Sequence, residues 1–395
     1  MDFRDSPSEA AFRAEARAFL EAHAPDPREM YGDDPLNASN VEAHRAWQKT
    51  QHEHGWAGLT WPVQYGGRGL GPIEQIIWNQ ELARQGLGLS MFMPGLCMAG
   101  PTIIAHGSGE QKQRYLGPLL SGDEIWCQLF SEPGAGSDLA GVACRAERDG
   151  DGDGWVIQGQ KTWSSGAADA DFGILLCRTD PTVPKHEGIT YFLLPMKTPG
   201  VEVRPIRQMN DGDHFADTFL NEVRIPDACR LGPVNGGWAC AMTTLLNERI
   251  GMGGMESFRF DDLAALARER RERLDPVTRD RVVRVWGWGK TLELLNARIV
   301  TKLGMGVMPD AESSVMKLAI ARLMSEAADL GLAALGPEAL GRAGTWQNQF
   351  LFAPAMHVAG GTDEIQKNVA AERTLGLPKE PRADQGVAFQ DLPRG

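Results

Sequence analysis

The apolar residues change their spacing twice along the chain. In residues 1–122 they recur at the helical interval of three to four positions, which predicts a helical N-terminal domain. One face of the first predicted helix carries four of them: Phe12, Ala16, Phe19 and Leu20. Further helices are predicted at residues 44–51 and 72–84, joined by segments rich in glycine and proline.

Between residues 123 and 233 the apolar spacing shortens toward two, which predicts a small β domain. Its predicted strands are residues 155–163, 172–177, 190–194 and 201–206. Helical spacing then returns to about residue 373, with breaks predicted at Pro276, Pro309, Gly336–Pro337 and Pro354. The stretch from Pro378 onward is rich in proline and charge and is predicted to be an extended arm. We therefore predict an α+β chain with domains at residues 1–122, 123–233 and 234–395.

Composition limits the classes of function. The chain has 395 residues, 42% of them hydrophobic, with a formal net charge of −12 and a pI near 5.2. This acidity argues against nucleic acid or an anionic membrane as a partner. The six cysteines form no C-x-x-C pair, which suits a reducing compartment. We predict a soluble, cytoplasmic protein, because there is no signal-peptide pattern and no apolar stretch long enough to span a bilayer.

One acidic stretch is similar to part of a calcium-binding loop. Asp149, Asp151 and Asp153 alternate with glycines up to Gly154, as in the first half of an EF-hand loop. The twelfth position, however, is Gln160 rather than a bidentate Glu, and the residues before it have a strand pattern where an EF-hand needs a helix. We therefore interpret the stretch as a hairpin turn and expect no metal site.

The run of residues 126–138 is the most informative segment. A strand-like stretch ends in a loop that contains Pro133, two glycines and the hydroxyl groups of Ser131 and Ser137. Glycine allows the backbone to approach a ligand closely, and serine supplies hydroxyl and amide donors. Loops of this composition are usually plain turns, so this loop alone does not establish a binding site.

Two other segments change that interpretation. Residues 160–166 place Trp163 and Ser165 at the end of a predicted strand, and residues 360–368 read Gly-Gly-Thr-Asp-Glu-Ile-Gln-Lys-Asn. Together with residues 126–138, these segments resemble the flavin-binding loops of the acyl-CoA dehydrogenase family, in particular its bacterial FadE-like members. The predicted order of domains is also that of the family, whose fold has a β-barrel-like middle domain and a C-terminal four-helix bundle.

The resemblance implies an FAD site with named residues. Trp163 would cover one face of the flavin ring, while Ser131 and Ser165 would hydrogen-bond near its N5 edge. Ser137 would lie where the FAD pyrophosphate and the pantetheine arm of an acyl-CoA substrate approach. The remaining residues implied at the cofactor are Gln128, Phe130, Gly136, Thr362 and Glu364. Without its neighbours, Trp163 would instead be interpreted as a core tryptophan of the β domain.

The predicted FAD site has one unusual anion contact and two departures from the family pattern. Thr362 can cap a helix whose free amide groups favour anions, but Asp363 and Glu364 would repel phosphate, so the contact must use backbone and hydroxyl groups. Gln128 stands where many relatives carry a tyrosine beside the ring. The Arg-x-x-Phe-Gly segment that usually holds the adenine end is absent from the region of residues 274–279.

The resemblance also implies a reaction, in which a carboxylate base removes the proton α to a thioester. In much of the family the base is a Glu directly before Gly-Thr, where this chain has Gly360. A smaller branch, including isovaleryl-CoA and long-chain types, carries the base on the first C-terminal helix directly before an arginine, as in Glu248–Arg249. We predict Glu248 as the base. The predicted substrate-binding residues are Ser137, Arg249 and Gly360, whose backbone N–H would polarise the thioester carbonyl.

The surroundings of Glu248 support that role. If residues 238–257 form a helix, small and apolar side chains flank Glu248, which predicts a carboxyl pKa raised from about 4.3 toward ~6–7. The alternative is a solvated surface glutamate, which is the more common fate of this residue type. Moving the base away from Gly360 leaves room there, so we expect a branched, bulky or long acyl group.

We therefore predict an FAD-dependent acyl-CoA dehydrogenase that passes electrons to an electron-transferring flavoprotein and forms a homodimer or homotetramer. Two alternatives remain open. The missing adenine contact suggests a flavin-poor partner subunit of a heterotetramer, and relatives that react with oxygen suggest an oxidase or monooxygenase. The sequence does not specify the acyl group, which could be fatty, branched or steroid-derived.

Overall fold

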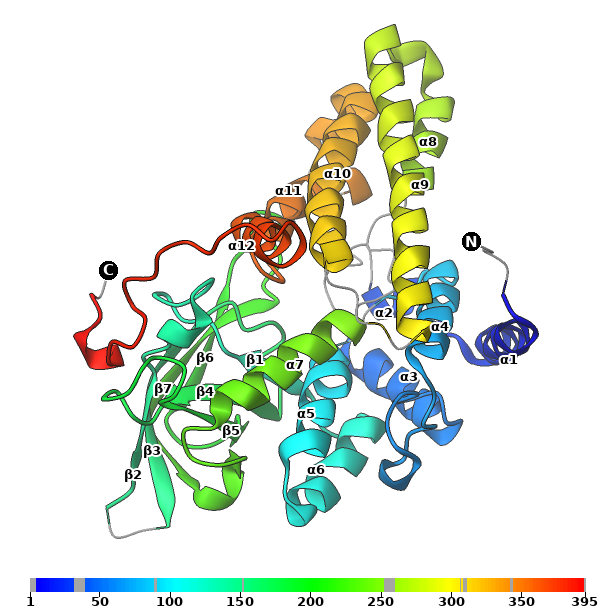
Figure 1. Cartoon of the computed structure of the whole chain (residues 1–395). Helices are drawn as coiled ribbons and strands as arrows, with labels where there is room; N and C mark the ends of the chain where they lie inside the picture. The colour runs from blue at the N-terminus through cyan, green and yellow to red at the C-terminus, as the bar shows by residue number, and fades with distance from the viewer. Residues whose placement is uncertain are drawn as a thin grey trace. The chain divides into compact units, whose positions relative to one another are not determined.

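The computed structural model describes residues 5–31, 40–88, 91–150, 153–251, 260–305, 307, 311–341 and 344–393. Helices come first, strands form the middle and helices follow, so the predicted α+β fold class is confirmed (Figure 1). The chain divides into two compact units. Unit 1 contains residues 1–36, 71–88 and 254–380, and unit 2 contains residues 37–70, 89–253 and 381–395. The units do not follow the three predicted domains, whose boundaries stay a prediction.

Unit 2 contains a sheet of eight strands in the order β6-β7-β3-β2-β4-β5-β8, with β1 paired in parallel to β4. The strands are β1 Trp126–Leu129, β2 Arg145–Arg148, β3 Gly154–Lys161, β4 Phe172–Arg178, β5 Ile189–Pro195, β6 Val201–Ile206, β7 Phe215–Pro226 and β8 Arg230–Leu231. The four predicted strands are confirmed as β3 to β6. The acidic stretch is confirmed as the connection of a β2–β3 hairpin, in which the Asp149 amide donates to the Gly154 carbonyl.

Strand β4 shows why the sheet holds two hydrophobic cores. Successive side chains of a strand point to opposite faces. Ile174 and Leu176 therefore pack into one core with residues of the neighbouring helices, while Leu175 and Cys177 pack into a second core on the other face. Because both faces are covered, β4 is a continuous apolar run rather than an alternating one.

Most of the helices of unit 2 contribute buried residues to the core that contains Ile174. The unit's helices are α3 Val41–Glu53, the π-helical turn η2 Pro94–Ala99, α5 Gly100–His106, α6 Gly109–Ser121 and α7 Gly237–Gly251. Helices α5, α6 and α7 lie side by side, and α7 also packs on η2 and on β5 (Figure 1). Cys240 and Ala241 of α7 are completely buried in the same core as Ile174.

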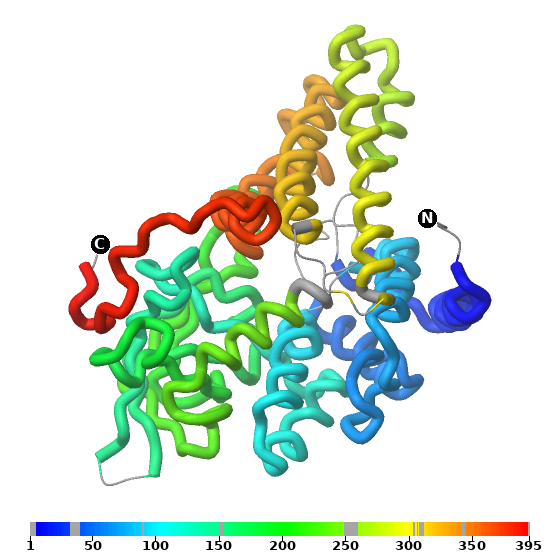
Figure 2. The backbone as a smooth tube through the Cα atoms, in the orientation of Figure 1, coloured from blue at the N-terminus to red at the C-terminus, as the bar shows by residue number. Residues whose placement is uncertain are grey.

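Unit 1 is helical. Its helices are α1 Pro7–His23, α2 Pro27–Tyr31, α4 Pro72–Arg84, α8 Phe260–Glu269, α9 Pro276–Gly304, α10 Ala311–Leu335, α11 Thr345–Met356 and α12 Asp363–Val369. The predicted face of α1 is confirmed, since its four apolar residues are its buried ones, and Ser6 and Glu9 form the capping box that begins the helix. The long helices α9 and α10 pack side by side (Figure 2).

The predicted helix breaks have mixed outcomes. Helix α9 begins at Pro276 and α10 ends directly before Gly336, as predicted, whereas Pro309 lies outside the described residues. The break at Pro354 is wrong, because α11 continues through this proline to Met356. The proline has no amide hydrogen to donate to the carbonyl of Phe350, and the helix ends two residues beyond it. None of the described helices is both long and apolar enough to cross a membrane.

Candidate functional site

The two predicted flavin loops of unit 2 are joined directly by a hydrogen bond. The amide of Thr162, at the end of β3, donates to the carbonyl of Ser131, just beyond β1, at 2.9 Å. The ammonium of Lys161 also donates to the carbonyl of Phe130 at 3.1 Å. Hydrogen bonds thus join two segments that lie some thirty positions apart in the sequence.

A buried ion pair holds this junction together. The Lys161 ammonium lies 2.7 Å from a carboxylate oxygen of Glu132, and the two side chains are 0% and 8% exposed. Glu132 also accepts hydrogen bonds from the backbone amides of Ala143 and Cys144. A buried ion pair is tolerated only where hydrogen bonds satisfy its remaining groups, and this pair meets that condition. The sequence prediction missed both residues.

Trp163 follows directly after this junction and is not a core residue. Its side chain is 60% exposed, and its backbone has φ of +58°, a conformation that is rare for a bulky residue. The indole ring packs edge-on against Phe215, with the ring centroids 5.9 Å apart. The alternative interpretation as a core tryptophan is therefore wrong. Backbone strain of this kind concentrates at functional sites, and the exposed ring presents a flat apolar surface to a ligand.

The serine and glycine loop, residues 131–138, is closed by backbone hydrogen bonds near its start and exposed to solvent near its end. The backbone amides and carbonyls of Glu132 and Ala135 bond to each other at 3.0 Å, which closes a tight turn. Added side-chain carbons at Gly134 and Gly136 would meet nothing within 4 Å, and Ser137 is exposed. A ligand can therefore approach the backbone here. Of the other predicted cofactor residues in unit 2, Gln128 and Ser131 are half-buried, Ser165 is exposed and Phe130 is buried.

These features fit the flavin end of FAD. An isoalloxazine ring needs one flat apolar wall and hydrogen-bond donors along its polar edge. The exposed indole of Trp163 would supply the wall, and the hydroxyl and amide groups of the half-buried Ser131 and the exposed Ser165 would supply donors. The open glycine backbone before Ser137 suits the approach of an anionic pyrophosphate, which needs close backbone contact.

The predicted base lies on a helix whose inner face is fixed by packing. In α7, Ala241 and Thr244 are completely buried. Glu248 follows them by seven and four positions, so it shares their face of the helix and is half-buried. Burial raises the pKa of the neighbouring Cys97 to about 12, and the negative charge of Glu248 acts in the same direction. The thiol beside Glu248 therefore stays neutral.

A cluster of buried hydroxyl groups sets the orientation of α7. The hydroxyl of Thr244 lies 2.8 Å from that of Thr102 in α5 and 3.0 Å from the phenol oxygen of Tyr191 in β5. Burial raises the pKa of Tyr191, so its phenol stays protonated and can donate. This arrangement fixes the rotation of α7 about its axis one turn before Glu248, which positions the carboxylate.

The glycine-rich segment of unit 1 forms a turn before α12. Gly360 and Gly361 have φ of +65° and +90°, and a side chain at Gly360 would meet nothing within 4 Å. Thr362 caps α12, as predicted, by accepting from the amide of Ile365. The predicted cofactor residue Glu364 is exposed.

A polar cluster in unit 1 anchors this turn to α10. Nδ1 of His357 lies 2.6 Å from Asp363, and its Nε2 lies 3.0 Å from the hydroxyl of Ser325. Lys317 pairs with the second oxygen of Asp363 at 2.9 Å. Burial opposes the shift, but His357 and Lys317 together hold the pKa of Asp363 below its ordinary value. The glycine turn is thus held to α10 on both sides, through His357 before it and Asp363 after it.

The predicted site residues Gln128, Phe130, Ser131, Gly136, Ser137, Trp163, Ser165 and Glu248 all belong to unit 2. Hydrogen bonds join the segment of Ser131 to the end of β3, and the approach of Glu248 to these loops stays a prediction. Gly360, Thr362 and Glu364 belong to unit 1, and their approach to the first set stays a prediction. The side chain of Arg249 lies outside the described residues. No three His, Cys, Asp or Glu side chains gather as metal ligands do in the part of the chain that the structure describes.

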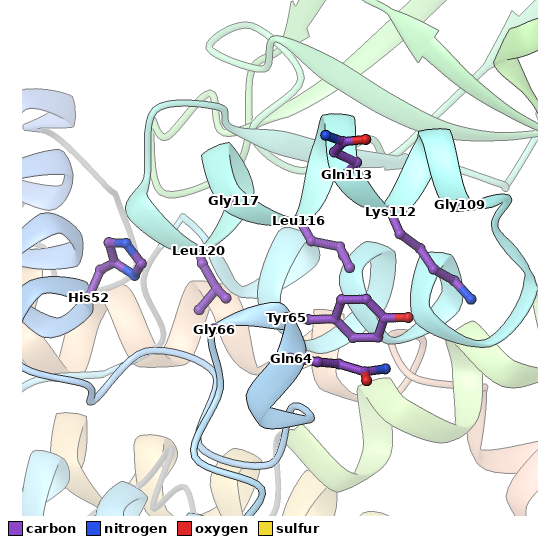
Figure 3. A pocket seen from close by; sticks show the side chains of 10 residues that line it. All are labelled: His52, Gln64, Tyr65, Gly66, Gly109, Lys112, Gln113, Leu116, Gly117 and Leu120. Carbon is purple, nitrogen blue, oxygen red and sulfur yellow. The ribbon is translucent and has the colours of Figure 1, made fainter.

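Unit 2 also contains a pocket of about 470 Å³ that shares no residue with the predicted site (Figure 3). Leu116 and Lys112 extend from α6 toward the ring of Tyr65, and the Lys112 ammonium lies 6.0 Å from the ring centroid. The other lining residues are His52, Gln64, Gly66, Gly109, Gln113, Gly117 and Leu120. The pocket is thus separate from the two predicted flavin loops, which other residues of unit 2 form.

Comparison with known families matches nearly the whole chain. The models of the acyl-CoA dehydrogenase N-terminal, middle and C-terminal domains match residues 6–123, 127–223 and 235–375. The chain belongs to the acyl-CoA dehydrogenase family. Members of this family are flavoprotein oxidoreductases of fatty-acid and lipid metabolism, so the predicted family and enzyme class are confirmed.

Two curated acyl-CoA dehydrogenases of Mycobacterium tuberculosis illustrate the relationship. FadE34 is 41% identical over 335 residues, which are 81% of this chain but 44% of FadE34. The chain therefore spans less than half the length of that relative. IpdE1 is 35% identical over 349 residues, which are 86% of this chain and 90% of IpdE1.

Solved acyl-CoA dehydrogenase structures share the fold. The Tcur3481-Tcur3483 steroid ACAD is 31% identical with a TM-score of 0.84, covering 96% of this chain and 100% of that chain. The ChsE4-ChsE5 complex from Mycobacterium tuberculosis is 29% identical with a TM-score of 0.80 and the same coverage. A glutaryl-CoA dehydrogenase from Mycobacterium smegmatis, solved with FADH2, shares the fold at 21% identity and a TM-score of 0.74, covering 95% of this chain and 97% of that chain.

Proposed function

We propose that the chain is an FAD-dependent acyl-CoA dehydrogenase that converts an acyl-CoA thioester to the 2-enoyl-CoA, with Glu248 as the base. One observation carries the proposal: a single compact unit holds both the joined flavin loops with the exposed Trp163 and the half-buried Glu248. Membership of the family supplies the class of reaction.

Glu248 performs the proton transfer in this proposal. Its carboxylate accepts the proton from the carbon α to the thioester, and the electron pair of that C–H bond forms the new double bond as hydride leaves the β carbon. When bound, FAD supplies the acceptor for that hydride. The backbone N–H of Gly360 donates to the thioester carbonyl, which stabilises the negative charge that develops on its oxygen.

The residues proposed to hold FAD divide by the part of the cofactor they contact. Trp163, Ser131 and Ser165 hold the ring, with Gln128 and Phe130 beside it. Gly136 and Ser137 are proposed to contact the pyrophosphate and the pantetheine arm, and Thr362 and Glu364 are proposed to contact the pyrophosphate. Arg249 contacts the substrate. The electrons then pass to an electron-transferring flavoprotein in the cytoplasm.

The proposed substrate is a bulky acyl-CoA, branched, long or steroid-derived. The absence of a side chain at Gly360 supports this, because an added side-chain carbon there would meet no atom within 4 Å. The steroid ACAD among the solved relatives supports it as well.

Anaerobic addition of acyl-CoA esters to the FAD-loaded protein tests the proposed function. We expect the flavin absorption to bleach with bulky esters more rapidly than with short straight-chain esters. Bleaching confined to short straight chains would contradict the proposed substrate class. Rapid release of hydrogen peroxide when air is admitted would instead identify an oxygen-reactive enzyme.

A mixed oligomer is the second candidate, and a homodimer or homotetramer is the first. The mixed oligomer is supported by two of the solved relatives, Tcur3481-Tcur3483 and ChsE4-ChsE5, each of which combines two different proteins. Measuring bound flavin in the purified chain separates the two candidates. A colourless protein that takes up FAD only when a second chain is added would favour the mixed oligomer.

Replacing Trp163 by alanine is expected to weaken FAD binding about two- to tenfold, because the ring loses an aromatic contact of about 0.5–1.5 kcal/mol. The midpoint of thermal unfolding of the FAD-free protein should change little, since the side chain is 60% exposed. Trp163→Phe, which keeps an aromatic wall, should retain most of the affinity. Titration of FAD into each apoprotein, with unfolding followed in parallel, checks this. Unchanged FAD affinity in Trp163→Ala would contradict the role of the indole.

A further inference from the structure

The C-terminal arm returns to unit 2 after the helices of unit 1. Residues 381–395 belong to the same compact unit as the sheet, although residues 254–380 belong to the other. The arm packs beside the loop that joins β4 to β5 (Figure 2). Amides of Phe389 and Gln390 donate to the carbonyls of Val183 and Pro181 at 2.9 Å, and Ala388 forms an isolated bridge with Pro184. The predicted extended arm is thus attached to the β domain.

The arm covers a buried arginine, Arg178, at the end of β4. The ring of Phe389 lies 3.9 Å from the guanidinium carbon, and Arg178 is 3% exposed. Arg178 donates to the carbonyls of Ala140 and Val142, which directly follow the serine and glycine loop. Burial lowers the pKa of Arg178 to about 10. Its desolvated charge therefore depends on these carbonyls and on the aromatic face of Phe389.

A lysine connects the arm to the loop itself. The Lys185 ammonium lies 2.7 Å from a carboxylate oxygen of Asp138, the last residue of the loop, and 2.6 Å from Asp384 of the arm. Lys185, and then Arg382, hold the pKa of Asp384 at about 2. The backbone carbonyl of Lys185 also accepts from Arg178 at 2.7 Å. The two contacts of the arm therefore converge on the same short stretch of chain, residues 138–142.

We propose that the C-terminal arm, residues 381–393, is a strap that positions the loop of Gly136, Ser137 and Asp138 through Lys185 and Arg178. Asp384 and Phe389 are the two anchor points of the strap. If the proposed function holds, the strapped loop is the one that receives the FAD pyrophosphate and the pantetheine arm, so the strap controls binding rather than the proton transfer. Lys185 and Arg178 are positioning residues in this role.

The test compares the full chain with a chain that ends at Glu380, using two readouts. Amide hydrogen exchange of the FAD-free protein reports on the loop directly, and we expect faster exchange in residues 134–142 of the shortened chain. In FAD and acyl-CoA titrations, we expect the Kd for FAD and the KM to rise about tenfold while kcat changes less than about twofold. Adding a synthetic peptide of residues 381–393 should reverse both effects.

Point variants keep the test valid if the shortened chain does not fold. Phe389→Ala and Asp384→Asn should each increase exchange in residues 134–142 and raise the KM. Asp391→Asn makes the same chemical change at an exposed position of the arm and should do neither. Unchanged exchange in the shortened chain and in both anchor variants would overturn the strap. A full chain that binds no FAD would overturn the proposed function instead, while the exchange measurement would still decide on the strap.

Discussion

Replacing Glu248 by glutamine is expected to leave the protein able to bind FAD but to slow flavin reduction by acyl-CoA about 10²–10⁴-fold. Glutamine has nearly the same shape as glutamate but cannot accept the α proton. The fold should be retained, because Glu248 is half-buried and the buried contacts of α7 are made by other residues, among them Thr244 and Ala241. Stopped-flow measurement of flavin bleaching under anaerobic conditions, at saturating substrate, checks the prediction.

Glu110→Gln is the matched control for this variant. Glu110 lies at an exposed position in the first turn of α6, so the same chemical change there should leave the rate of reduction unaltered. Glu248→Asp, which keeps the carboxylate but withdraws it by one methylene group, should fall between the wild type and Glu248→Gln. Bleaching of Glu248→Gln at the wild-type rate would contradict the assignment of the base.

Replacing Lys161 by methionine is expected to lower the free energy of unfolding by about 3–5 kcal/mol, because it leaves the Glu132 carboxylate buried without its partner. The change should also reduce retention of FAD, since Lys161 joins the two flavin loops through Phe130 and Glu132. Denaturant unfolding of the apoprotein and flavin content after gel filtration measure the two effects.

An exposed ion pair provides the control for Lys161→Met. Lys197 pairs with Asp171 at 3.2 Å, but its side chain is 87% exposed, so Lys197→Met should cost at most about 1 kcal/mol. In the double variant Lys161→Met with Glu132→Gln, the loss should be smaller than the sum of the single losses, because the second change removes the unpaired charge. Equal losses for Lys161→Met and Lys197→Met would show that the buried pair does not stabilise the loops.

The sequence predicted those helices and strands in which the apolar residues repeat at one regular interval from end to end. The first helix was predicted down to its buried residues, because Phe12, Ala16, Phe19 and Leu20 repeat at helical intervals. Strand β7, the twelve-residue strand Phe215–Pro226, was not predicted. Its apolar alternation is interrupted at Asn221 and Glu222, and Glu222 has a positive φ. A local irregularity of this kind breaks the period that identifies a strand.

The predicted site was incomplete for a related reason. Motif residues such as Trp163 and Ser137 could be read from the sequence because they are adjacent to recognisable glycines and serines. The residues that hold the loops act through contacts between segments far apart in the sequence: Lys161 with Glu132, Arg178 with Ala140 and Lys185 with Asp138. No periodicity indicates such a contact. The signal that could have found Lys161 is its charge at the end of a strand in which Trp155 and Ile157 are buried at alternate positions.

The surroundings of Glu248 were predicted in part. Ala241 and Thr244 are buried neighbours on its helical face, as expected. Of the neighbours expected on its other side, Gly251, Met252 and Met255, the two methionines lie outside the described residues. The hydroxyl cluster of Thr102, Thr244 and Tyr191 was not predicted, because it joins α5, α7 and β5. Its members come from three separate stretches of the chain, so only the fold brings them together.

A single anaerobic turnover measures the proposed dehydrogenation by Glu248 and FAD itself. The FAD-loaded protein is mixed with a slight excess of a bulky acyl-CoA, and the CoA esters are then identified by mass spectrometry while the flavin absorption is recorded. The proposed dehydrogenation predicts one 2-enoyl-CoA, lighter than the substrate by two hydrogens, for each flavin reduced, with Glu248→Gln forming none on the same timescale. Reduced flavin without enoyl-CoA, or equal enoyl-CoA from Glu248→Gln, would contradict it.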